Sequence, residues 1–155
     1  MLVALVDTNV GVSGVLSGDA DSATVGILDA MLAGTLRFVL SEALLAEYRH
    51  VLLRPSIRER HRLAEWEVDA ILEDVVVNSG FRESPPLGEV ALMDQEASAP
   101  VIGGALVPGD EHVLALLAVA PEAVLVTGDR RLRVAVAPWR EALTPAEFLA
   151  RLQGG

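Results

Sequence analysis

Two aspartates stand directly after apolar runs that are too short to form helices. Asp7 follows residues 2–6, and Asp129 follows residues 123–127 after a single glycine. Short apolar runs of this kind are typical of strands buried on both faces of a parallel sheet. Because polar groups after such strands meet at one edge of the sheet, both carboxylates are expected there. Each also fits the alternative interpretation of a turn residue or a helix N-cap.

A third acid, Glu47, lies on an expected helix, close to an apolar stripe that includes Leu44 and Tyr48 at helical spacing. A carboxylate at the edge of an apolar face is costly unless it is paired or binds a metal. The alternative interpretation is an ion pair with Arg49 or Arg54, or exposure of the carboxylate to water. Glu47 is therefore a candidate ligand with a purely structural alternative.

The fourth acid, Asp110, stands at the expected start of a helix that carries Val113 and Leu114. A negative charge at this position is favoured by the helix dipole, so a simple N-cap is the alternative interpretation. Glu111 fits a first helical turn equally well, which leaves open which of the two acids would bind a cation. The spacing to the apolar residues of the helix favours Asp110.

Carboxylates that gather at one sheet edge repel one another, and their pKa values rise unless a cation neutralises them. Oxygen ligands without cysteine suit the hard ions Mg²⁺ and Mn²⁺. Carboxylate-bound Mg²⁺ best serves phosphoryl transfer, in which the ions activate water and stabilise the leaving oxygen. We therefore expect an Mg²⁺ or Mn²⁺ site, and its candidate catalytic and metal-binding residues are Asp7, Glu47, Asp110 and Asp129, with Glu111 as an alternative ligand.

The elements that must position these acids alternate between short apolar strands and helices. We expect strands at residues 2–6, 36–40, 123–127 and 134–137, a loop at 11–18, and helices at 22–33, 41–53, 65–78 and 110–120. Arg-rich helical sequence continues to residue 62, a short last helix begins at Thr144, and residues 81–109 show no sustained period. This alternation predicts an α/β fold with a parallel sheet and helices on both faces.

Composition narrows the class of protein further. The 155 residues suffice for one domain, which we place at residues 1–155, and 52% of them are hydrophobic. The absence of cysteine excludes disulfides and thiolate zinc sites and favours a reducing, cytoplasmic location. No apolar run approaches the roughly 20 residues of a membrane span, and the N-terminus has no basic region typical of a signal peptide. We therefore expect a cytoplasmic protein without a membrane partner.

The charged residues are unevenly distributed. The formal net charge of −10 argues against binding of nucleic acid by bulk electrostatics. All twelve cationic residues are arginines, however, and they cluster between residues 49 and 62 and between residues 130 and 133. The planar guanidinium matches phosphate oxygens, so candidates for contacting RNA phosphates are Arg49, Arg54, Arg130 and Arg131. Solvated helix faces are the alternative interpretation of both clusters.

Four segments resemble the acidic motifs of PIN-domain ribonucleases and occur in the order of that family. Residues 2–9, an apolar strand followed by Asp-Thr-Asn, resemble the opening of the family, and residues 40–55 resemble its second acidic helix. Residues 110–116 resemble the third-acid helix, and residues 126–132 resemble the closing Thr-x-Asp segment. The resemblance spans most of the chain and is greatest to a bacterial branch of toxin components (VapC-like).

This resemblance implies a three-layer α/β/α sandwich with a central, mainly parallel sheet of four to five strands. It also implies a metal-dependent endoribonuclease that acts as the toxin of a toxin–antitoxin pair, forms a homodimer and binds a cognate antitoxin protein. The four acids would then bind one or two Mg²⁺ or Mn²⁺ ions at the RNA substrate. Thr8, Asn9 and Thr127 would position the ligands or water by hydrogen bonds.

The sequence departs from this branch just before the third-acid helix. Val107 and Gly109 stand where the branch carries further acids, and these replacements bear on a second metal site. Together with the net charge of −10, they leave a non-enzymatic alternative open. In that alternative, a degenerate PIN-like domain acts as a non-catalytic protein- or RNA-binding module.

Overall fold

The structure, a computed structural model, describes residues 2–83 and 110–154. Its centre is one sheet of five strands in the order β3-β2-β1-β4-β5, in which every neighbouring pair is parallel. The strands are β1 (Val3–Val6), β2 (Arg37–Leu40), β3 (Gly80–Phe81), β4 (Ala123–Val126) and β5 (Ala142–Leu143). All five carboxyl ends therefore face the same edge of the sheet.

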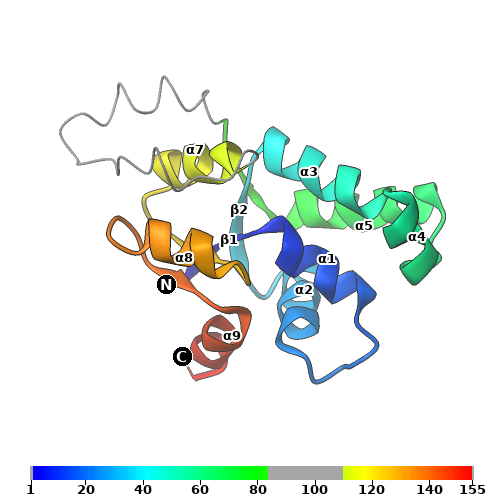
Figure 1. The fold of residues 1–155 in the computed structure, drawn as a ribbon, viewed down its shortest axis with the longest axis horizontal. Helices are drawn as coiled ribbons and strands as arrows, with labels where there is room; N and C mark the ends of the chain where they lie inside the picture. The colour runs from blue at the N-terminus through cyan, green and yellow to red at the C-terminus, as the bar shows by residue number, and fades with distance from the viewer. Residues whose placement is uncertain (1, 84–109, 155) are drawn as a thin grey trace.

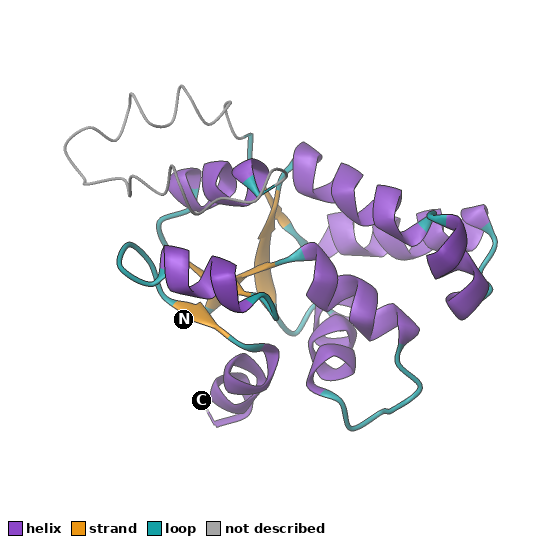
Figure 2. Ribbon diagram, in the orientation of Figure 1, coloured by secondary structure: helices purple, strands orange, loops and turns teal. Residues whose placement is uncertain are grey.

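Helices cover both faces of this sheet (Figures 1 and 2). Because all neighbouring strands are parallel, each connection between them must cross over the sheet, and helices form these connections. The described helices are α1 (Thr8–Leu16), α2 (Ala23–Ala33), α3 (Glu42–Leu52), α4 (Pro55–His61), α5 (Glu65–Asn78), α7 (Glu111–Val119), α8 (Arg130–Val136) and α9 (Pro145–Gly154). The last of these, α9, returns to pack against α2. This is the three-layer α/β/α sandwich predicted from the sequence.

Local capping signals set several of the predicted helix boundaries. The side chain of Ser22 caps α2, and Gly34 ends that helix in the left-handed conformation, with φ of 76°. The side chain of Ser41 caps α3, and Thr144 forms reciprocal hydrogen bonds with Glu147 at the start of α9. Each of these polar groups satisfies backbone N–H or C=O groups that a helix end leaves free. The predicted starts of these three helices are therefore confirmed.

The predicted loop at residues 11–18 is wrong, because most of this segment belongs to α1. Gly14 in this segment serves close packing rather than a turn. A Cβ atom at Gly14 would lie 2.7 Å from the carbonyl oxygen of Thr24 and 2.8 Å from Cβ of Leu28. Gly14 thus allows α1 and α2 to approach closely, and this packing outweighs the low helix propensity of glycine.

The predicted strand at residues 134–137 is also wrong, because residues up to Val136 form α8. Asp129 caps this helix, and its buried apolar residues lie at helical spacing, at Leu132 and Val136. The edge strand is instead β5, which is too short to show a period in the sequence. The same holds for β3, which lies at the beginning of the segment without a recognisable pattern.

The core lies on both sides of the central strands. Leu5 of β1, Leu125 of β4 and Leu40 of β2 are fully buried, as the continuous apolar runs predicted. Phe148 of α9 is the largest fully buried side chain among the described residues. None of the described helices has both the length and the apolar character that crossing a bilayer requires.

Candidate metal centre

Strand register brings Asp7 next to Thr127. Val6 of β1 pairs with Val126 of β4, so the next residue of each strand lies at the same level beyond the sheet. The amide of Asp7 donates to the carbonyl oxygen of Val126 at 2.9 Å, and the hydroxyl of Thr127 donates to Oδ2 of Asp7 at 2.6 Å. Oδ1 of Asp7 accepts from the amide of Thr8 at 2.9 Å. Asp7 is 7% exposed and Thr127 is fully buried, so this carboxylate is held rigidly.

Asp129 is joined to the same pair through Thr127. Its amide donates to Oγ1 of Thr127 at 3.1 Å, and its Oδ1 accepts from the amides of Arg131 and Leu132 at the start of α8. The alternative interpretation of Asp129 as an N-cap is therefore correct. It does not exclude a ligand, because within residues 2–83 and 110–154 no hydrogen bond is formed by Oδ2, which is the atom left for a cation.

Asp110 adds a third carboxylate from the start of α7. It occupies the N-cap position of α7, as the alternative interpretation expected, but its side chain makes no capping hydrogen bond with the helix. Burial raises the pKa of Asp110, and the negative charges of Asp7 and Asp129 raise it further. These three acids therefore share one electrostatic environment, although Asp7 and Asp129 lie more than 100 residues apart in the sequence. Glu111 is exposed, and its charge adds a smaller increase to the pKa of Asp110.

The pKa of Asp7 is also raised, chiefly because the carboxyl group is buried. The hydrogen bonds from Thr127 and Thr8 and the charge of His112 lower this pKa, while the charge of Asp129 raises it. Burial outweighs the stabilising contacts, so the ionised carboxylate of Asp7 is incompletely compensated by the protein. A carboxylate in this condition gains stability from a cation.

Two buried polar atoms beside these acids lack partners. Among the described residues, Oγ1 of Thr8 and Nε2 of His112 make no hydrogen bond although both are buried. His112 is half-buried, and its charge lies within range of Asp7 and Asp110. Its position one residue before the buried Val113 is the signal that it borders the core face of α7.

Glu47 lies on α3, half-buried, and its charge is not among the influences on the pKa of Asp7 or Asp110. The predicted ion pair with Arg49 does not form, because that guanidinium binds Glu65 and Asp69 of α5 at 2.6 and 2.9 Å. Arg49 is consequently engaged in joining α3 to α5. The structure thus joins Asp7 to Asp129 through Thr127 and brings Asp110 within electrostatic range of both, whereas among the described residues Glu47 forms no hydrogen bond or ion pair with these acids.

Tyr48, the neighbour of Glu47, ties α3 to the end of β1. Its buried hydroxyl donates to the carbonyl oxygen of Val6, the residue before Asp7. Burial raises the pKa of the Tyr48 hydroxyl above its usual range, and the charge of Asp7 raises it further. The sequence places Tyr48 in an apolar stripe, but it carries no signal for this hydrogen bond across 42 residues.

Oxygen-rich donors at this edge fit a hard divalent cation. Within residues 2–83 and 110–154, no three acidic or histidine side chains lie close enough together to form a complete metal cage. Mg²⁺ does not require one, because it keeps several waters and uses one or two protein carboxylates. The raised pKa values of Asp7 and Asp110 and the unpartnered hydroxyl of Thr8 match such a partly hydrated ion.

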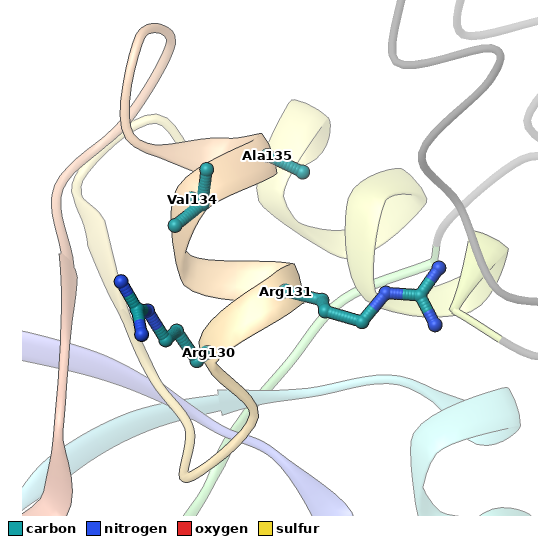
Figure 3. A pocket seen from close by; sticks show the side chains of 4 residues that line it. All are labelled: Arg130, Arg131, Val134 and Ala135. Carbon is teal, nitrogen blue, oxygen red and sulfur yellow. The ribbon is translucent and has the colours of Figure 1, made fainter.

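The remaining predicted residues lie on or next to α1, α4 and α8. Thr8 is buried and Asn9 is exposed on the first turn of α1. Arg54 is exposed at the start of α4. Arg130 and Arg131 line a pocket of about 330 Å³ on α8 together with Val134 and Ala135, and Figure 3 shows the two guanidinium groups extending away from each other on two sides of the helix.

The described part of the chain is therefore a parallel α/β sheet with Asp7 and Asp129 at the carboxyl ends of β1 and β4. Comparison with known proteins identifies the family: residues 3–131 match the PIN domain, and the chain belongs to that family. PIN domains are generally nucleases, and these nucleases generally use divalent metal ions.

A solved structure supports the fold. The crystal structure of PAE2754 from Pyrobaculum aerophilum matches with a TM-score of 0.59 and 20% sequence identity, over 99% of this chain and 91% of that one. At this identity the similarity supports the architecture alone. No curated protein gives a significant match.

Proposed function

We propose that this chain is an Mg²⁺- or Mn²⁺-dependent endoribonuclease that hydrolyses RNA phosphodiester bonds and acts as the toxin of a toxin–antitoxin pair. The observation that carries the nuclease activity is the link from Asp7 through Thr127 to Asp129 at the carboxyl edge of the sheet, with the charge of Asp110 in electrostatic range and the pKa values of Asp7 and Asp110 raised. The toxin role rests on the resemblance of the acidic motifs to that branch of PIN domains.

Each residue of the proposed metal centre would have a distinct role. Asp7 and Asp129 would hold the cation from the ends of β1 and β4, and Asp110 would hold it from the start of α7. A bound Mg²⁺ or Mn²⁺ supplies activation of a water and neutralisation of the leaving oxygen. Thr127 keeps Asp7 oriented through its 2.6 Å hydrogen bond, and such supporting contacts typically change metal affinity or activity by about 10- to 100-fold.

Cleavage of a labelled single-stranded RNA tests the activity. We expect cleavage with Mg²⁺ or Mn²⁺, none with a chelator, and a loss of at least about 100-fold in the Asp7→Asn variant. Asp29→Asn is the matched control, because Asp29 is an exposed aspartate on α2, remote in the chain from the sheet edge. Retained cleavage in a correctly folded Asp7→Asn variant contradicts the proposal.

Thermal unfolding tests the metal site without reference to activity. A ligand that binds only the folded protein stabilises it by about 2.7 kcal/mol at a concentration 100-fold above its dissociation constant. We therefore expect Mn²⁺ to raise the melting temperature of the wild type and of Asp29→Asn. Asp7→Asn should show little or no increase, because it removes a charge from the centre.

A second candidate function is binding without cleavage, as in a degenerate PIN domain. One observation favours it: within residues 2–83 and 110–154, no three acidic or histidine side chains lie close enough together to enclose a metal ion. The replaced acids Val107 and Gly109 lie outside the described residues. Binding of RNA without a melting-temperature response to Mn²⁺ and without cleavage would select this alternative.

We also propose the homodimer and the antitoxin complex that the resemblance implies. Exposed apolar side chains support a protein partner, since Trp66 and Val77 of α5 are 72% and 79% exposed. They lie eleven residues apart, about three helical turns, and therefore on the same face of α5. Sedimentation of the purified chain, alone and co-expressed with the product of an adjacent gene, tests both proposals.

A further inference from the structure

A groove of about 360 Å³ begins beside the candidate metal centre and lies between α1 and α4. We call it the α1–α4 groove, and its lining residues are Asn9, Val12, Ser13, Leu16, Ser17 and Arg60. Figure 1 shows α1 leading from the end of β1 toward α4. Because Asp7 caps α1, the groove starts two residues from the most buried acid of the centre.

One face of α1 presents a row of polar groups along this groove. Asn9, Ser13 and Ser17 are spaced by four residues, so they follow one side of the helix. At 1.5 Å per residue, the row extends for about 12 Å away from the metal centre. The hydroxyl of Ser17 accepts from the amide of Asp19, which leaves its own hydrogen available to donate. The hydroxyl of Ser13 shares a hydrogen bond with that of Thr24 at 3.2 Å, in which either group can donate, so the row presents one amide and two hydroxyl groups, of which that of Ser13 is already engaged.

Arg60 supplies a positive charge on the opposite wall. It is exposed, and within residues 2–83 and 110–154 no acidic side chain forms an ion pair with it, whereas Arg49, Arg82 and Arg151 are all paired. Several other described arginines, Arg58 among them, also form no ion pair, so what distinguishes Arg60 is its position in the wall of the groove. Its planar fork favours a phosphate oxygen, and serine hydroxyls and an amide complete the donors that such an anion uses.

We propose that the α1–α4 groove binds the backbone of a single-stranded RNA next to the cleaved bond, with Arg60 contacting a phosphate. This inference rests on the proposed nuclease function and specifies where the substrate continues beyond the metal centre. A cationic groove that follows the backbone is the usual means of holding single strands without sequence preference. The polar row continues from the acids, so one strand can occupy both.

Arg60→Gln tests the groove, and Arg58→Gln is the matched control. Both arginines are exposed on α4, and both substitutions remove one positive charge, but only Arg60 lines the groove. Binding of a fluorescent single-stranded RNA is measured by anisotropy in an Asp7→Asn background, which blocks cleavage. We expect Arg60→Gln to weaken binding about tenfold and to reduce the slope of log K against log salt by roughly 0.7, the value of one phosphate contact on a single strand. Arg58→Gln should change neither quantity to this extent.

Two further measurements separate a binding role from a structural one. In the cleaving background, Arg60→Gln should raise KM with little change in kcat, since the groove lies outside the reacting centre. Arg60→Lys should keep the salt slope but recover only part of the affinity, because lysine keeps the charge and loses the fork. Unchanged melting temperatures show that the variants fold.

Each outcome decides between the claims. If Arg60→Gln and Arg58→Gln change RNA binding equally, or if neither changes it, the proposed role of the groove is overturned. Cleavage of RNA by the wild type would then still support the nuclease function. Absence of cleavage in the wild type, with binding lost only in Arg60→Gln, overturns the nuclease and supports the groove. Competition by an acidic peptide as effective as that by RNA would show a protein ligand and overturn the RNA assignment.

Discussion

Replacing Thr127 by valine removes the hydrogen bond on which the orientation of Asp7 depends, while keeping the shape of the side chain. The hydroxyl of Thr127 donates to Oδ2 of Asp7 at 2.6 Å and accepts from the amide of Asp129 at 3.1 Å. Thr127 is fully buried, so water cannot readily replace either contact. The substitution therefore leaves a buried carboxylate and an amide without this partner.

The expected loss follows from these two contacts. A hydrogen bond to a charged group contributes about 1.5–3 kcal/mol, and a neutral one contributes about 1 kcal/mol. With Asp7 ionised, Thr127→Val should lower the free energy of unfolding by about 3 kcal/mol, after a small gain from the apolar valine. For a chain of this size, that corresponds to a decrease of roughly 6–12 °C in Tm.

The loss should depend on pH in a defined direction. The pKa of Asp7 is raised by burial, and Thr127→Val raises it further because the lowering hydrogen bond is lost. Near pH 4, about the ordinary pKa of aspartate, the folded protein carries a protonated Asp7 and only neutral hydrogen bonds are lost. The destabilisation should therefore be about 1–2 kcal/mol smaller near pH 4 than near pH 8.

Urea unfolding followed by circular dichroism, with a chelator present, measures both values. Thr35→Val is the control, because Thr35 is exposed and its hydroxyl makes only a 3.4 Å contact with the carbonyl oxygen of Ala30. It should change the free energy of unfolding by less than about 0.5 kcal/mol at either pH. An equal loss at both pH values in Thr127→Val would show that the ionised Asp7 does not depend on this hydroxyl.

Two further predictions concern helix packing and the charge of the centre. Gly14→Ala should destabilise the protein by about 1–3 kcal/mol, because the new Cβ would lie 2.7 Å from a backbone oxygen. In the control Gly11→Ala, the new Cβ would lie 3.6 Å from the Tyr48 ring, so this substitution should be neutral or stabilising. The urea unfolding midpoints of the two variants measure the difference. Asp110→Asn should stabilise the metal-free protein at neutral pH, because the raised pKa of Asp110 means that its ionised form opposes folding as pH increases. The gain in the free energy of unfolding over the wild type should vanish below the ordinary pKa of aspartate. If the free energies of unfolding of variant and wild type instead differ by the same amount at every pH, Asp110 does not share the electrostatic environment of Asp7 and Asp129.

The sequence determined the layout of the fold wherever short-range signals were strong. The apolar runs that became β1, β2 and β4 and the capping residues Ser22 and Ser41 were sufficient to predict the sandwich. These features depend on neighbours within a few residues, which the sequence displays directly. The positions of Asp7 and Asp129 at strand ends follow from the same local signals.

Features that depend on contacts between residues distant in the sequence were decided by the tertiary structure. The glycines of α1 indicate a loop by propensity, yet the close contact of Gly14 with α2 makes them part of a helix. Likewise, the register between β1 and β4 joins Thr127 to Asp7 across 120 residues, and the tertiary structure brings the charge of Asp110 within range of Asp7. Distances between side chains from different elements are fixed by packing and register, because a shift of one residue would turn each carboxylate to another side of the sheet.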